Sequence, residues 1–100
     1  MQIQHLNIAK QLTSYFAGKP VKKAYLFGSY IRNENKEDSD IDILLDIEDG
    51  VGLLMLSRMR IDISAMLHQK VDIVTSASLS PRIKIFVDAD KQLIYEKQDR

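Results

Sequence analysis

Apolar residues recur along the chain with two different spacings, and these spacings predict helices that alternate with strands. Helical spacing over residues 3–17 predicts an amphipathic helix, with an apolar face formed by Ile8, Leu12, Tyr15 and Phe16. Short apolar and β-branched runs predict strands over residues 21–27, 40–46, 71–75 and, at a sheet edge, 92–96. Further helices are expected over residues 29–33, 51–68 and 82–88.

Turn-forming residues separate these elements and support their limits. Gly18 and Pro20 end the first helix, and Gly28 ends the first strand. Ser80 and Pro81 have the pattern of a helix N-cap followed by a first-turn proline. Loops or turns are expected over residues 33–39, 48–50, 75–79 and 88–91. Because helices separate the strands, we expect an α/β (α+β) fold, in which helices flank a small mixed β-sheet.

Two segments are more apolar than a one-sided element requires. The strand over residues 40–46 is apolar on both faces beyond its first aspartates, so we expect it in the centre of a sheet that helices cover. The helix over residues 51–68 has a core stripe formed by Leu56, Met59, Ile63, Met66 and Leu67. Leu54, Ile61 and Ala65 widen this stripe to a second side. A broad buried face explains the width, and so does a helix that contacts both the sheet and a partner protein.

The composition is that of one folded domain over residues 1–100. Its 45% apolar residues predict a globule, and its 14 basic and 14 acidic residues give no net charge. Without a basic surface, nucleic acid is not expected as a direct ligand. The lack of cysteine excludes disulfides and thiolate metal sites. With no signal-peptide pattern and no apolar run near ~20 residues, we expect a cytoplasmic protein without a membrane partner.

Two aspartates stand at the start of the expected central strand. Asp40 and Asp42 are two residues apart, so in a strand their side chains lie on one face, roughly 6–7 Å apart. Two carboxylates at this spacing repel each other unless a cation lies between them. Mg²⁺ prefers oxygen ligands and often binds one or two carboxylates together with substrate phosphates. The pair therefore predicts a metal-dependent phosphoryl or nucleotidyl transfer site.

Gly28 and Ser29 follow directly after the first apolar strand. Glycine lets the backbone turn sharply and approach a ligand closely, and a helix that begins here would present free N–H groups to a phosphate. The Ser29 hydroxyl can add a donor or cap the helix. Arg32, one helical turn later, either reaches the same anion or pairs with Glu34 or Asp38.

The spacing of these residues also resembles a family signature. Gly28-Ser29, ten intervening residues and Asp40-x-Asp42 are similar to the motif of the nucleotidyltransferases related to DNA polymerase beta. The arginine three residues after Ser29 and the serine before Asp40 resemble the compact form found in the minimal nucleotidyltransferases. The resemblance covers nearly the whole chain, and it implies the polymerase beta-like nucleotidyltransferase fold.

The resemblance assigns roles to further residues. The family uses a third carboxylate on a neighbouring strand, and the matching segment, residues 70–74, places that role on Asp72. The other interpretation of Asp72 is an exposed position on an edge strand. The chain departs from the family at Ile31, where a small residue is common, and at Asn33, where glycine is common. These departures affect the loop after Arg32, where substrate contacts are expected, more than the metal ligands.

The resemblance also implies an activity, a cofactor and a partner. The three aspartates would bind two Mg²⁺ ions, while Gly28, Ser29 and Arg32 would bind the phosphates of ATP, the expected nucleotide donor. Asp72 would also accept the proton of the acceptor hydroxyl. Minimal nucleotidyltransferases commonly act as antitoxins that transfer AMP to a tyrosine of a HEPN-domain ribonuclease toxin. The implied function is therefore a protein adenylyltransferase with a HEPN toxin as its partner.

Two other functions fit the same residues. The chain could be a non-catalytic binding subunit that neutralises or scaffolds its partner by contact. It could instead transfer nucleotides to a small molecule as a homo-oligomer, in which a neighbouring subunit closes the site. Loss of partner control in an Asp40→Ala, Asp42→Ala variant that still binds the partner separates the enzyme from the binding subunit.

Overall fold

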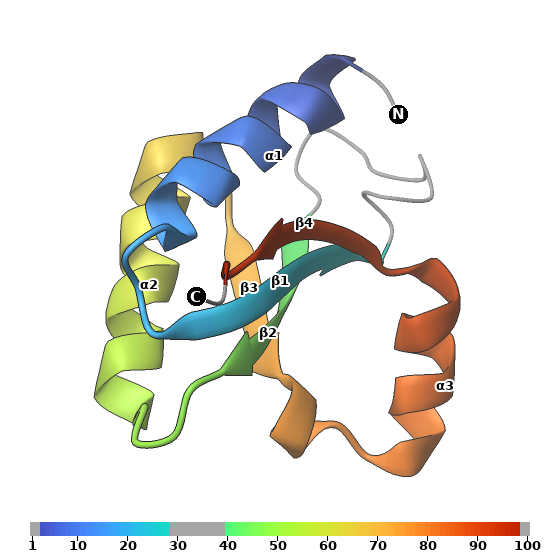
Figure 1. The fold of residues 1–100 in the computed structure, drawn as a ribbon. Helices are drawn as coiled ribbons and strands as arrows, with labels where there is room; N and C mark the ends of the chain where they lie inside the picture. Colours follow the sequence, from blue (N-terminus) through green and yellow to red (C-terminus); the bar gives the residue numbers. More distant parts are fainter. Residues whose placement is uncertain (1–2, 29–39, 99–100) are drawn as a thin grey trace.

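The computed structural model describes residues 3–28 and 40–98. In this part of the chain helices and strands follow the order that the apolar spacing predicts (Figure 1). The elements in order are α1 (Ile3–Phe16), β1 (Val21–Phe27), β2 (Ile41–Ile47), α2 (Leu53–Leu67), β3 (Val71–Thr75), the short 3₁₀ helix η1 (Ser76–Ser78), α3 (Pro81–Asp90) and β4 (Gln92–Glu96). No helix in these ranges is long and apolar enough to cross a membrane.

The four strands form one mixed sheet in the order β3-β2-β1-β4. β1 pairs antiparallel with β2 on one side and with β4 on the other. β2 and β3 are parallel, and α2 connects them, because a parallel pair needs a long crossover connection. The predictions of a mixed α/β sheet, an interior β2 and an edge strand β4 are therefore confirmed.

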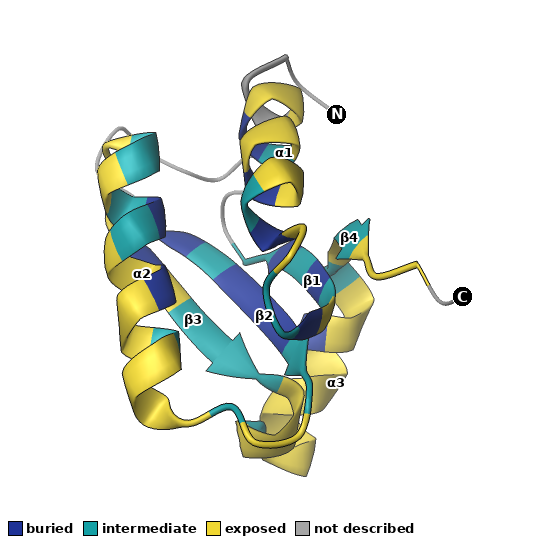
Figure 2. Cartoon of the chain, turned by 60° about the vertical axis from the view of Figure 1, so that its left-hand side comes forward, coloured by how far each residue is buried: buried dark blue, intermediate teal, exposed yellow. Residues whose placement is uncertain are grey.

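The hydrophobic core lies on one face of this sheet, beneath α1 and α2. Ile41, Ile43 and Leu45 alternate along β2, and all three are fully buried on this face. They belong to one cluster with side chains of both helices, which include Leu12, Phe16, Met59 and Ile63. Figure 2 shows the buried segments of β1 and β2 under these helices. Each such side chain stabilises the fold by about 1.5–3 kcal/mol relative to exposure, so this face holds the sheet in place.

α3 lies on the opposite side of the sheet (Figure 1). Val87 of α3 is buried, and the Lys91 Nζ at its C-terminal end lies 4.7 Å from the ring centroid of Tyr25 on β1. Other apolar side chains of α3 stay exposed, including Phe86 and Ile85. This face is therefore less completely covered than the face beneath α1 and α2, and polar groups of the strands can reach solvent there.

α2 differs from the prediction of a broad buried face. Met59 and Ile63 are buried, but Leu54 is 89% exposed, Ile61 is 57% exposed, and Ala65 is exposed as well. Of the two explanations offered for the wide apolar stripe, the broad buried face is therefore not found, because a helix presents only one stripe to a sheet. The wide apolar surface of α2 is left for solvent or for a partner.

α3 extends further than the sequence pattern predicts. It continues to Asp90, into the segment of residues 88–91 where a turn was expected. The carboxylate of Asp88 lies 2.8 Å from both Lys84 Nζ and Lys91 Nζ, and such pairs one turn apart support a helical end. At the start of α3, the Ser80 hydroxyl accepts a bond from the Ile83 N–H, so the predicted cap is confirmed.

Two further segments differ slightly from the prediction. β2 begins at Ile41 rather than at residue 40, and part of the loop expected over residues 75–79 forms η1. The helix predicted over residues 29–33 lies outside the described residues.

Candidate active site

Two of the predicted site aspartates lie side by side on neighbouring strands. In the parallel β2–β3 ladder, Asp42 is the register partner of Asp72. Register partners point to the same face, and neighbouring strands are about 4.8 Å apart. Asp42 is half-buried, whereas Asp72 is exposed because β3 is an edge strand. The sheet therefore brings together two carboxylates that are 30 positions apart in the sequence.

Asp40 stands one residue before β2, at the same end of the sheet. If the extended chain continues back to this residue, alternation puts Asp40 on the same side as Asp42. The backbone here is fixed by the Ile41 N–H, which donates a 3.0 Å hydrogen bond to the Lys70 carbonyl. The Lys70 ammonium lies 3.8 Å from Asp40 Oδ2. The start of β2 and the start of β3 are thus tied together at the end of the sheet that carries Asp40, Asp42 and Asp72.

Gly28 lies directly against the Asp42 carboxylate. Phe27 is the register partner of Asp42 in the β1–β2 ladder, and the chain leaves β1 at Gly28 with a φ of +82°. A Cβ placed on Gly28 would overlap Asp42 Oδ2 and lie 3.3 Å from its Cγ. Glycine is therefore needed here twice, for the backbone conformation and for the space that the carboxylate occupies. The sequence predicts that a ligand approaches Gly28 closely, but it does not predict that the Asp42 carboxylate occupies this space.

The predicted phosphate-binding residues are described only in part. Gly28 is at the site, beside Asp42. Ser29 and Arg32 lie outside the described residues, and so do the two departures from the family, Ile31 and Asn33. The phosphate contacts of Ser29 and Arg32 therefore remain predictions from the sequence.

The chemistry of the donor set fits Mg²⁺. Asp42 and Asp72 offer carboxylate oxygens from adjacent register positions, and the missing side chain of Gly28 leaves room for the Asp42 oxygens. Across residues 3–28 and 40–98, no three His, Cys, Asp or Glu side chains already converge closely enough to hold a metal ion. Mg²⁺ commonly keeps several water or phosphate ligands, so two or three protein carboxylates are sufficient.

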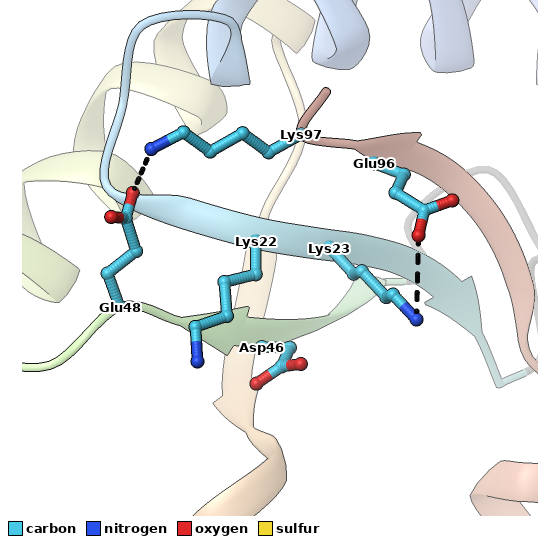
Figure 3. Close-up of a pocket in the computed structure, with 6 residues that line it drawn as sticks. All are labelled: Lys22, Lys23, Asp46, Glu48, Glu96 and Lys97. Carbon is cyan, nitrogen blue, oxygen red and sulfur yellow. Dashed lines mark hydrogen bonds and ion pairs between the residues drawn. The ribbon is translucent and has the colours of Figure 1, made fainter. Parts of the chain in front are cut away.

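Asp46 shares a face with Asp42 but lies in a different environment, about 13 Å further along β2. Figure 3 shows it in a charged hollow with five other side chains, namely Lys22, Lys23, Glu48, Glu96 and Lys97. Lys97 Nζ lies 2.9 Å from Glu48 Oε2, and Lys23 Nζ lies 3.6 Å from Glu96 Oε2. Equal numbers of basic and acidic groups balance each other here, so the hollow is not a strong anion site.

Known relatives match the chain over most of its length. The chain is 47% identical, over 64% of its own length and 69% of the relative, to a Methanocaldococcus jannaschii protein with the provisional name protein adenylyltransferase MJ0435. It is 43% identical, over 63% of its length and 64% of the relative, to protein adenylyltransferase MntA of Thermococcus cleftensis.

Solved structures share the fold. A protein with the provisional name minimal nucleotidyltransferase superposes with a TM-score of 0.79 at 31% identity, over 92% of this chain and 95% of that one. A complex of the tri-AMPylated HEPN toxin of Shewanella oneidensis with its MNT antitoxin contains a chain that matches with a TM-score of 0.71 at 24% identity. That match covers 96% of this chain and 75% of the other.

A family pattern covers nearly the whole sequence, including every aspartate of the site. Residues 10–100 match the family described as Polymerase beta, Nucleotidyltransferase. The chain belongs to this family, and it is a minimal nucleotidyltransferase of the group that includes the protein adenylyltransferases.

Proposed function

We propose that this protein transfers AMP from ATP to a tyrosine of a HEPN-domain toxin and so acts as its antitoxin. The observation that carries the proposal is the juxtaposition of Asp42 and Asp72 in register, with Gly28 making room for the Asp42 carboxylate. The names of the relatives support AMP transfer to protein, and the AMPylated HEPN toxin in a structure of the same fold supports the class of acceptor.

Asp40, Asp42 and Asp72 would hold two Mg²⁺ ions, which when bound neutralise the triphosphate and stabilise the attacking and leaving oxygens. Asp42 lies on β2, which is held between β1 and β3, and its carboxylate orients the triphosphate end of the nucleotide. Asp72, the exposed member, stands where an acceptor can approach, and its carboxylate accepts the proton of the tyrosine hydroxyl. The tyrosine oxygen bonds to the α-phosphorus of ATP. The bond from this phosphorus to the oxygen that bridges the α and β phosphates breaks, and pyrophosphate leaves.

An exposed apolar surface supports a protein partner. At the start of α2, Leu53 and Leu54 are more than four-fifths exposed and Met55 is 42% exposed. Apolar side chains gathered in this way are typical of protein interaction surfaces. The same surface also suits the rival function, in which the protein controls its partner by contact without chemistry.

Transfer of label from [α-³²P]ATP with Mg²⁺ tests the proposal, with the protein purified together with its partner. We expect label on the partner from wild type, and a fall of at least about a hundredfold in the Asp40→Ala, Asp42→Ala variant. Asp46→Ala is the matched control, because it removes a carboxylate from the same face of β2 outside the site. Unlabelled partner in an intact complex, with other nucleoside triphosphates also tried, contradicts the proposal and favours the binding subunit.

A further inference from the structure

Lys70 contacts the start of β2 twice. Its carbonyl accepts the Ile41 N–H at 3.0 Å, and its ammonium lies 3.8 Å from Asp40 Oδ2. It also stands immediately before β3 and two residues before Asp72. Lys70 is thus the cationic side chain that the structure places beside the site carboxylates in the described part of the chain.

The ion pair between Lys70 and Asp40 is poorly suited to stabilising the fold. The Lys70 side chain is 74% exposed, the Asp40 side chain is 33% exposed, and their separation is at the long end for an ion pair. Exposed pairs of this kind contribute little to stability, and the backbone bond from Ile41 already ties the two strands. Lys84 and Asp88 on α3 form a tighter pair, at 2.8 Å, that serves a helix end.

We propose that Lys70 is a positioning residue that exchanges partners when the nucleotide binds. Its ammonium holds Asp40 while no divalent cation is present, and it turns to the phosphates once a cation takes the Asp40 oxygens. This inference rests on the proposed function. One carboxylate cannot bind the ammonium and a divalent cation equally well at once, so the two compete. A lysine has a flexible stem and three donors, which suit it to contact a phosphate as a point charge.

Lys70→Met tests the exchange, because it keeps the length of the side chain and removes the charge. The electron paramagnetic resonance signal of free Mn²⁺ measures how tightly the ion binds in the absence of nucleotide. We expect Lys70→Met to bind Mn²⁺ about two- to fivefold more tightly than wild type. At saturating Mg²⁺, the KM for ATP is expected to rise by a similar or larger factor while kcat changes less. Lys70→Arg should restore the KM, and Lys84→Met should leave both measurements unchanged.

Two outcomes overturn the inference: equal Mn²⁺ affinity in wild type and Lys70→Met, or an unchanged KM for ATP. These failures are distinct from failure of the proposed function. If the Asp40→Ala, Asp42→Ala variant loses AMP transfer while Lys70→Met behaves as wild type, only the role of Lys70 is wrong. If wild type leaves its partner unlabelled, the proposed function itself is wrong, and if the double variant transfers AMP normally, the assignment of Asp40 and Asp42 to the site is wrong.

Discussion

Alternate residues of β2 face two different environments, although they belong to one short strand. Ile41, Ile43 and Leu45 are fully buried under α1 and α2. On the other face, Leu44 is also buried, but Asp42 lies half-buried beside Gly28 and the exposed Asp72. The buried face packs against the core and holds β2 in position, so the start of the strand can carry a charged residue on its other face.

The position of the carboxylates limits the energetic penalty of this arrangement. Charged groups buried in the middle of a sheet would be expensive, because desolvation disfavours the ionised form. Here Asp42 is at the start of β2, and its register partner Asp72 is on an edge strand that water reaches. Two carboxylates can therefore stay close together with a modest loss of stability, which a bound cation would reverse.

The largest expected contrast is between neighbouring residues of β2. Ile43→Ala should lower the free energy of unfolding by about 2–5 kcal/mol, because it leaves a cavity in the core. Asp42→Ala should change the same quantity by less than about 1 kcal/mol, although we expect it to abolish AMP transfer. Urea unfolding of both variants measures the contrast. A loss of several kcal/mol in Asp42→Ala would show that the carboxylate is a structural group rather than a site residue.

Much of this arrangement can be predicted from the sequence. Alternation and turn residues place β1 and β3 at their observed limits and β2 within one residue. The parity of Asp40 and Asp42 predicts a shared face, and the pattern of residues 71–75 predicts that Asp72 lies on a strand. Local periodicity is sufficient for these features because they depend on which residues a strand can bury.

Other features could not be predicted, because they depend on tertiary register. That Gly28 lies against Asp42 follows from how β1 pairs with β2, and local patterns do not fix that pairing. The exposure of Leu54 and Ile61 depends on which stripe of α2 the sheet covers. The approach of Lys70 to Asp40 joins two strand starts that are distant in sequence.

Gly28→Ala tests whether Gly28 is needed to leave room for the Asp42 carboxylate or only for the backbone turn. The left-handed φ predicts a loss of about 1–2 kcal/mol in stability. Displacement of Asp42 by the new Cβ should also lower AMP transfer, by up to about a hundredfold at a temperature where the variant is folded. Gly18→Ala is the matched control, because Gly18 has a φ of +87° and a Cβ added there would meet no atom within 4 Å. Equal activity in the two variants would contradict a role for Gly28 beside Asp42.

The smallest expected effect concerns the face covered by α1 and α2. Tyr15 Oη donates a 2.8 Å hydrogen bond to Asp62 Oδ2, and burial, followed by this bond and the Asp62 charge, raises the Tyr15 pKa above its usual 10.0. A raised folded-state pKa stabilises the fold below pH 10, and this contribution is lost as the pH rises further. Tyr15→Phe should therefore lower stability by about 0.5–1.5 kcal/mol at pH 8 and remove part of the decline above pH 10.

Urea midpoints between pH 8 and pH 11 measure this effect of Tyr15 directly. Because Tyr15 packs on the core face, AMP transfer at pH 8 should equal that of wild type. Parallel pH curves for the two proteins would show that the bond to Asp62 does not favour the neutral phenol. A large loss of AMP transfer in a folded Tyr15→Phe variant would instead show that the core face of the sheet also affects the site on the other face.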